Sequence, residues 1–257
     1  GSKNSKGRAI QNLINIEQDD RVKAFICTQD LKDEEYVNSN YVIMATKMGQ
    51  VKKTSLEQYS RPRSNGINAI TVKDGDELLE AKLTNGNSQI MLAVQSGKAI
   101  RFEESKTRPM GRNASGVRGI RLKDSKDEVV GMISVNDMDA NILVVSENGY
   151  GKRSSLEDYR LTNRGGKGVK TISITEKTGK LVTLKSVSDN DDLMIINKSG
   201  IAIRMQVEDL RVMGRATQGV KVISLKDGDS IAAVAKVMKD DDDIEDINEI
   251  EYTGDTV

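Results

Sequence analysis

The chain has 257 residues, 37% of them hydrophobic, and its 39 Lys and Arg residues balance 39 Asp and Glu residues. It contains no His and one cysteine, Cys27, which excludes an intrachain disulfide, zinc sites and His-based catalysis. It also lacks Trp, has few other aromatic rings for stacking unpaired bases, and contains no apolar run of the roughly 18 residues that a membrane span needs. These features favour a protein of a reducing compartment that has several thin cores and does not bind single strands.

The net charge of zero hides an uneven distribution of charge. Nine acidic residues and no basic ones occur beyond Lys239, so the rest of the chain has 30 acidic against 39 basic residues. A basic body that ends in an acidic segment predicts a polyanionic partner. We expect residues 240–257 to be a disordered acidic tail. Its run Asp240–Asp243 lacks the glycine and terminal glutamate of a calcium loop.

Taken in order, the chain begins with half of a repeat. Residues 3–14 match only the second half of a unit that recurs later, so we interpret residues 1–16 as the remnant of an upstream blade and expect the natural protein to extend upstream. Residues 22–27 are a strand candidate, and the polar residues 30–40 predict an exposed loop.

Four full repeats follow within residues 17–239. Each has two apolar strands around a glycine turn, then a basic loop with a second glycine, an alternating run such as Val169–Ile174, a polar turn and another apolar strand. The hairpin glycines are 48, 52 and 51 residues apart, and the loop glycines are 50, 52 and 51 residues apart. Two features that keep one period of about 50 residues, with about four strands each, predict an all-β, propeller-like fold of four complete blades. The hairpin glycines are Gly49, Gly97, Gly149 and Gly200, and the loop glycines are Gly66, Gly116, Gly168 and Gly219.

A first basic group follows the hairpin glycine of every unit. Cations on an edge strand also discourage sheets from pairing, so one such residue alone would mean little. Recurrence at the same point of each blade predicts instead a positive belt that faces outward on one rim. This group consists of Lys52, Lys53, Lys98, Arg101, Lys152, Arg153 and Arg204.

A second basic group lies in the long loops. Its most specific stretch is Arg164-Gly165-Gly166-Lys167-Gly168, because glycines let backbone N–H groups approach phosphate oxygens while the two cations neutralise them. The alternative is an ordinary glycine-rich turn. The group consists of Arg61, Arg63, Arg108, Arg112, Arg118, Arg160, Arg164, Lys167, Lys170, Arg211, Arg215 and Lys221.

Other candidate sites are weaker. Residues 111–116 and 214–219 resemble a nucleotide P-loop, but Val117 and Val220 stand where that motif requires Lys, so we reject ATP binding. The pairs Glu103-Glu104 and Asp191-Asp192 are expected to be solvated loop charges. No catalytic or metal site is predicted.

Three stretches resemble a known family, namely Asn148–Arg153, Met110–Leu122 and Met213–Val220. They are similar to the C-terminal DNA-wrapping domain of the A subunit of bacterial DNA gyrase, a β-pinwheel with a close relative in topoisomerase IV. The resemblance extends from about Lys3 to Lys239. It implies a six-bladed disc whose basic rim bends double-stranded DNA, so that the enzyme core passes a segment in one direction and introduces negative supercoils.

The family's gyrase box, Q-R-R-G-G-K-G, is matched only by residues 162–168, which lack the leading Gln and the first Arg. The full box belongs to the first blade of the family. We therefore interpret this copy as a degenerate box in blade five, with blade one and part of blade two absent from the sequence. The family's catalytic tyrosine lies in an upstream domain and has no counterpart here.

The resemblance further implies a non-catalytic part of an ATP-dependent type IIA topoisomerase, in which ATP and Mg²⁺ are used elsewhere in the holoenzyme. The implied partners are DNA, the rest of gyrase A and gyrase B in an A2B2 assembly, without a membrane, in the bacterial cytoplasm and at the nucleoid. One alternative is the C-terminal domain of the corresponding topoisomerase IV polypeptide. A protein-interaction propeller of the WD-repeat kind is a lesser alternative, because such repeats carry Trp and His. A propeller enzyme would need convergent acid, base or metal ligands, which the sequence lacks.

Overall fold

The structure is a computed structural model that describes residues 20–238 together with residues 12 and 14. The predicted remnant over residues 1–16, those two residues aside, and the acidic tail over residues 240–257 lie outside the described residues. Of the helices in the described part, none is long and apolar enough to cross a membrane.

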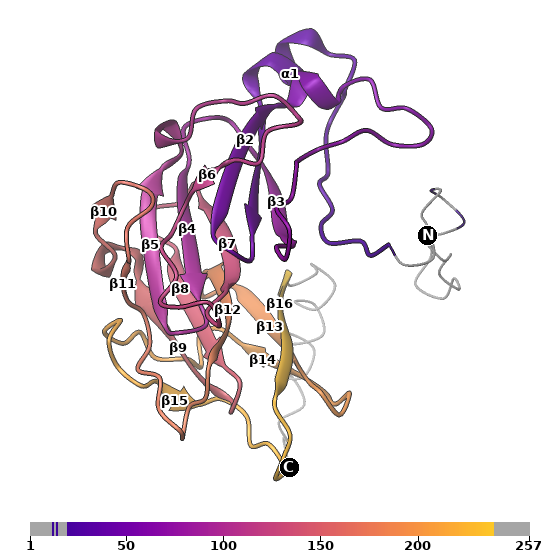
Figure 1. Ribbon diagram of the computed structural model, residues 1–257. Coiled ribbons are helices and arrows are strands. Elements are labelled where there is room, and N and C mark those ends of the chain that lie inside the picture. Colours follow the sequence, from indigo (N-terminus) through magenta and orange to yellow (C-terminus); the bar gives the residue numbers. More distant parts are fainter. Residues whose placement is uncertain (1–11, 13, 15–19, 239–257) are drawn as a thin grey trace, which may run out of the picture.

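The strands form four blades whose long strands pair antiparallel (Figure 1). Blade 1 contains β3 (Leu78–Thr84), β1 (Tyr41–Thr46), β2 (Gln50–Ser55) and β6 (Val117–Arg118), in that order. Blade 2 contains β7 (Val129–Val135), β4 (Gln89–Val94) and β5 (Lys98–Glu103), with β10 (Leu161–Thr162) and β11 (Val169–Lys170) against β5. Blade 3 contains β12 (Leu181–Val187), β8 (Asn141–Ser146), β9 (Tyr150–Ser155) and β15 (Val220–Lys221). Blade 4 contains β16 (Ile231–Met238), β13 (Asp191–Asn197) and β14 (Ala202–Gln206).

The outermost strand of each of the first three blades comes from the next repeat. The short strands β6, β11 and β15 pair with β2, β5 and β9 of the preceding blade. The chain reaches β6 and β11 through the 3-10 turns η3 (Glu104–Lys106) and η4 (Leu156–Asp158), and a similar turn, η2 (Leu56–Tyr59), follows β2. At the other edge, β3, β7, β12 and β16 contact one another in that order. The fold is therefore a β-pinwheel with exchanged outer strands.

This exchange explains three glycines of each series. Gly49 has φ of 81°, and a Cβ there would lie 2.9 Å from the carbonyl oxygen of Ile120, which belongs to the next repeat. Gly168 has φ of 70°, and its Cβ would lie 2.5 Å from the carbonyl oxygen of Ala99 in the preceding blade. A side chain at either place would meet both strain and backbone atoms. The two spacings agree because the hairpin turns at Gly49, Gly97 and Gly149 each pack against the following repeat.

The apolar cores lie between adjacent blades, as the low hydrophobic content predicts. One core joins Ile43 and Val51 of blade 1 to Leu92 and Phe102 of blade 2. Similar clusters join blades 2 and 3 and blades 3 and 4, and a fourth lies under the first helix. Blades 1 to 3 are thus packed on both faces, and both faces of their central strands are buried.

Three local predictions were wrong. Residues 22–27 form no strand. Ala24 and Ile26 pack against the apolar cluster at blade 1. The alternation of apolar and polar residues in this segment therefore reflects burial of one side, without hydrogen bonding to a neighbouring strand. The expected loop over 30–40 contains helix α1 (Glu34–Ser39), capped by Asp33, whose carboxylate accepts the N–H groups of Glu35 and Tyr36. The strand expected over 169–174 ends at Lys170, because the N–H of Thr171 turns to the carbonyl of Gly97.

Candidate nucleic-acid interface

The basic residue three places after the hairpin glycine is buried in blades 1 and 3. The Lys52 Nζ donates to the carbonyl oxygens of Ala69 and Arg112, each at 2.5 Å. The Lys152 Nζ donates to the carbonyl of Gly214 at 2.6 Å and to the hydroxyl of Thr217 at 3.2 Å. Neither lysine has measurable exposure. These two residues hold the long loops in place, and the prediction that they face outward was wrong.

Burial changes the acidity of both groups. Burial first, and then the positive charge of Arg112, lower the pKa of Lys52 from 10.5 to about 8. Burial is also the main reason that the pKa of Lys152 is lowered to about 8, an effect that Asp158 opposes and Arg215 increases. The equivalent positions of blades 2 and 4 hold Ile100 and Ile203, which need no acceptor.

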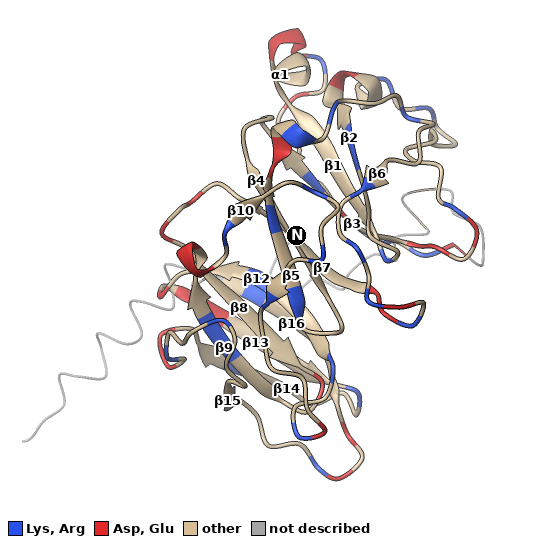
Figure 2. Cartoon of the chain, turned by 60° about the vertical axis from the view of Figure 1, so that its left-hand side comes forward, with Lys and Arg blue, Asp and Glu red and all other residues tan. Residues whose placement is uncertain are grey.

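The basic residue four places after the hairpin glycine is also buried in the first three blades. The Lys53 Nζ lies 3.2 Å from Glu104 Oε1 and 4.3 Å from the centre of the Tyr41 ring. Arg101 and Arg153 donate to backbone carbonyls, and Arg153 also pairs with Asp189. Arg204 in blade 4 differs, because its side chain is 42% exposed while Nε donates to Asp192 at 2.6 Å. Figure 2 shows blue segments, which mark Lys or Arg, within the strands β2, β5 and β9.

The expectation of solvated carboxylates was wrong for three residues. Glu104 is fully buried and accepts hydrogen bonds from the Thr84 hydroxyl at 2.7 Å and the Ser88 N–H at 3.2 Å. Asp191 and Asp192 are also buried, and each pairs with a cation. The amino-acid pattern contains no sign of this, because their partners come from other strands. Glu103 is exposed, as expected.

Exposed cations do recur on the outermost strands. Arg118, Lys170 and Lys221 each lie two residues after a loop glycine, on β6, β11 and β15, and all three are exposed. Two loop arginines lie against this row. Arg164 Nη1 donates to the carbonyl of Arg118 at 3.1 Å, and Arg215 Nη1 donates to that of Lys170 at 2.9 Å. We call Arg118, Lys170 and Lys221 the outer-strand row.

The backbone of the glycine-rich loop makes hydrogen bonds within the protein, although the loop also presents an exposed cation. The N–H of Gly165 donates to the carbonyl of Gly119 at 2.6 Å, and the carbonyl of Gly166 accepts from the N–H of Arg121 at 2.8 Å. The Gly165 N–H is therefore not available to a phosphate. Lys167 remains exposed, and with Arg160 and Asn163 it lines a hollow of about 160 Å³.

The remaining predicted cations lie at the surface. Arg61 and Arg63 line a polar hollow of about 390 Å³ together with the half-buried Arg112. Lys98 is half-buried at the start of β5. The exposed members of this set are Arg61, Arg63, Arg108, Arg160 and Arg211.

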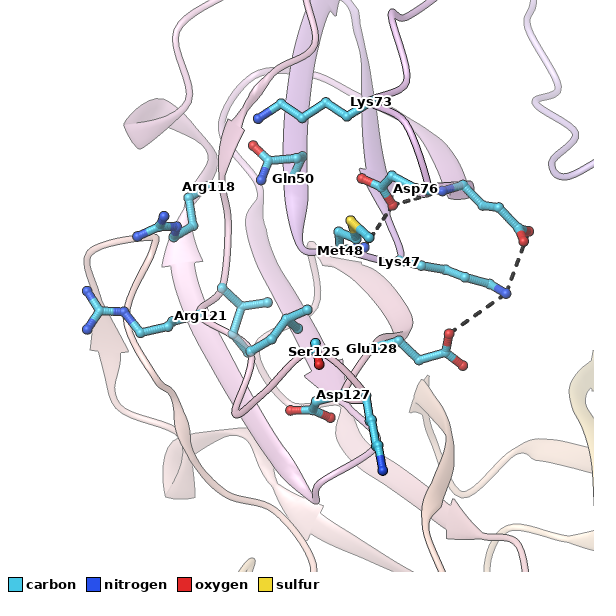
Figure 3. A pocket seen from close by; sticks show the side chains of 15 residues that line it. Lys47, Met48, Gln50, Lys73, Asp76, Arg118, Arg121, Ser125, Asp127 and Glu128 are labelled. Carbon is cyan, nitrogen blue, oxygen red and sulfur yellow. Dashed lines mark hydrogen bonds and ion pairs between the residues drawn. The ribbon is translucent and has the colours of Figure 1, made fainter.

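A larger hollow of about 650 Å³ lies between the hairpin turn of blade 1 and the turn at residues 123–128 (Figure 3). At its inner wall, Lys47 bridges Glu77 and Glu128 at 3.6 and 3.8 Å. On the other side Lys73 and Arg121 join Arg118, and their side chains extend the same way. Neither Lys73 nor Arg121 was predicted to bind DNA. Ser173 and Ser224 replace Arg121 in later repeats, so no recurrence marks that position.

No group of acidic or cysteine side chains in the described part of the chain is arranged to hold a metal ion. The surface offers instead a row of cations at one edge of successive blades. Such an edge can neutralise the phosphates of a duplex without reading its bases.

Comparisons with known proteins agree with this geometry. A family model described as the DNA gyrase C-terminal domain, beta-propeller, matches residues 40–85, 89–136, 140–188 and 191–238. The chain is 44% identical over 242 residues to the DNA gyrase A protein of Staphylococcus epidermidis, covering 94% of the chain and 26% of that protein. It is 43% identical over 258 residues to that of Staphylococcus aureus, covering the whole chain and 28% of that protein. The chain thus spans about a quarter of the length of these relatives.

Two solved structures share the fold. A DNA gyrase A C-terminal domain aligns with a TM-score of 0.79 and 26% identity, over 91% of this chain and 76% of the other. A C-terminal domain of DNA topoisomerase IV aligns with a TM-score of 0.83 and 24% identity, over 96% of this chain and 76% of the other. With a family match that covers all four blades, this chain belongs to the DNA gyrase C-terminal domain family.

Proposed function

We propose that this chain is the DNA-wrapping part of a gyrase A protein and that duplex DNA follows its outermost strands. The observation that carries the proposal is the outer-strand row, which presents an exposed cation at the same point of three successive blades. Arg61, Arg63, Arg108, Arg160, Lys167 and Arg211 add positive charge at the surface. The buried Lys52, Lys53, Arg101, Lys152 and Arg153 are removed from the proposed contact surface.

Energetics require a row rather than a single contact. Bending 20 to 30 base pairs through 40° to 90° costs on the order of 1–6 kcal/mol, and an exposed charge pair contributes about 1 kcal/mol or less. Several cations along the path can together offset that cost. We expect binding that depends weakly on sequence and steeply on salt.

The choice between gyrase and topoisomerase IV rests on identity. The relatives at 43–44% identity carry the name of the DNA gyrase A protein, whereas the topoisomerase IV domain is 24% identical and supports only the fold. A protein-interaction propeller has no specific observation in its favour.

The remaining assignments follow from the family. We infer that the chain has no active site of its own and serves an ATP-dependent type IIA topoisomerase that introduces negative supercoils. Its partners would be the rest of gyrase A and gyrase B in an A2B2 complex, which uses ATP and Mg²⁺ elsewhere, in the bacterial cytoplasm at the nucleoid. Residues 162–168 would be a degenerate gyrase box in the fifth of six blades.

The test replaces the outer-strand row. Each phosphate contact contributes about 0.9 to the slope of log K against log salt, so changing Arg118, Lys170 and Lys221 to Ala should flatten the slope by about 2.7. A control variant changes the exposed Lys32, Lys180 and Lys198 to Ala, which removes the same charge away from the outer strands. Equal slopes for the two variants would contradict the proposal.

A further inference from the structure

The chain crosses from each blade to the preceding one beside the same residue. Lys53, Arg101 and Arg153 occupy the fourth position after a hairpin glycine, and the crossing segment of the next repeat pairs with their backbones in parallel. The pairs are Lys53 with Pro109, Arg101 with Leu161 and Arg153 with Val212. The N–H groups of Met110 and Met213 donate to the carbonyls of Lys53 and Arg153, both at 2.8 Å. The first basic group therefore marks three equivalent junctions.

Each side chain binds the turn that begins the crossing. Arg101 Nη1 donates to the carbonyls of Leu156 and Tyr159 at 2.9 and 3.0 Å, at the two ends of the η4 turn. Arg153 Nε donates to the carbonyl of Leu210 in the corresponding turn of the fourth repeat, and its Nη1 donates to Asp189 Oδ1. Both side chains are more than nine-tenths buried. Within its own blade, Arg101 Nε also donates to Gln89 Oε1 at 2.7 Å, so one guanidinium joins two repeats.

At the first junction the residue that contacts the turn is a lysine and not an arginine. A lysine offers a single ammonium group and not the fork that lets arginine reach two carbonyls. Its partner is correspondingly a carboxylate, because Glu104 occupies the position at which the other turns have Leu56, Leu156 and Val207. At the two arginine junctions the turn position is apolar and the guanidinium donates to main-chain carbonyls, and Arg153 pairs in addition with Asp189 from outside the turn. At the lysine junction the carboxylate lies in the turn itself. Such a match between each cation and its turn is not expected of cations selected to contact phosphates.

We propose that Lys53, Arg101 and Arg153 are positioning residues that fix the angle between neighbouring blades and so set the curvature of the outer edge. The part of this inference that concerns DNA rests on the proposed function. The part that concerns the protein does not, since the junctions exist without DNA. We call these three the junction residues.

The test measures the protein alone. Spin labels at Met48→Cys and Lys198→Cys, in a Cys27→Ser background, report the distance between the exposed hairpin tips of blades 1 and 4, across all three junctions. Arg101→Met should broaden this distance distribution and shift it. The control is Lys180→Ala, an exposed cation outside the crossing segments, which should leave the distribution unchanged. A folded Arg101→Met protein with the parent distribution would overturn the inference.

If Arg101→Met does not fold, a second pair of variants tests whether the junction residues fix the angle between blades. Glu104→Leu removes the partner of Lys53 and should broaden the distribution, and adding Lys53→Arg should narrow it again by recreating the arginine type of junction. A Glu104→Leu protein with the parent distribution, or no recovery in the double variant, would overturn the proposal.

Measurements with DNA then separate the claim about the angle between blades from the claim about the curvature of bound DNA. Folded junction variants should retain the parent slope of log K against log salt within about 0.9, the value of one phosphate contact, while bending a duplex less sharply in a fluorescence end-to-end measurement. Altered blade distances with an unaltered bend would overturn the claim about curvature of the DNA. Failure of the parent protein to bind DNA would refute the proposed function and leave the distance measurement intact.

Discussion

Lys53 and Glu104 form an ion pair between two repeats, with Nζ and Oε1 3.2 Å apart and side chains that are 6% and 0% exposed. A carboxylate that loses such a partner remains buried without its cation. We expect Lys53→Met to lower the free energy of unfolding by about 3 kcal/mol, because breaking one side of a buried pair is strongly destabilising. Urea unfolding measures the change.

A surface pair provides the control. Lys82 and Glu80 are 2.7 Å apart but 34% and 24% exposed, so Lys82→Met should cost about 1 kcal/mol or less. If both substitutions have the same small effect, the Lys53–Glu104 pair does not hold the repeats together.

The buried lysines predict a pH dependence. Lys52 and Lys152 have pKa values near 8 in the folded protein against 10.5 for an ordinary lysine. Between these values the unfolded chain binds more protons, so the two groups make the free energy of unfolding rise with pH from about 8 to 10.5. A variant with Met at both positions should lack this contribution. Parallel stability curves for parent and variant from pH 8 to 10 would refute the assignment.

Arg164 and Lys167 belong to one loop but should behave differently. Lys167 is exposed, so Lys167→Ala should flatten the salt slope by about 0.9 and change stability by less than about 0.5 kcal/mol. Arg164 is half-buried and donates to the carbonyls of Lys106 and Arg118. Arg164→Ala should therefore lower the free energy of unfolding by about 1–2 kcal/mol, unlike Lys167→Ala. Binding titrations and thermal unfolding of both variants distinguish them. Similar stability losses in the two proteins would contradict the contrast.

The acidic residues beyond Lys239 allow a further prediction from charge alone. Nine carboxylates next to a body with a surplus of nine cations should compete with phosphate for the basic surface. Deleting residues 240–257 should tighten DNA binding, most clearly at low salt. Equal affinities of the intact and shortened chains at low ionic strength would leave the segment without this role.

The sequence predicted the repeat and the fold, because a turn with positive φ leaves a glycine at a fixed interval whatever surrounds it. The sequence did not predict correctly which cations are exposed to solvent. The alternation of a strand usually separates a buried from a solvated face, but these blades are packed on both faces, so Lys52 and Lys53 are both buried although they are adjacent.

The pairing of the outer strands could not be foreseen either. The sequence places Arg118 in the second repeat, whereas the structure places it in the sheet of blade 1. Glu104 was misjudged for the same reason, since Lys53 lies in another repeat. Arg118, Lys170 and Lys221 were predicted individually, yet only the exchange of strands shows that they occupy one edge.

The most direct test of the account is the reactivity of individual lysines toward an acylating reagent, measured by mass spectrometry with and without a short DNA duplex. The account predicts that Lys167, Lys170 and Lys221 react in the free protein and are protected by DNA, while the exposed Lys32 and Lys180 react equally in both states. The buried Lys52 and Lys152 should be unreactive throughout. Protection of Lys32 and Lys180, with Lys170 and Lys221 still reactive in the complex, would contradict the claim that DNA follows the outermost strands.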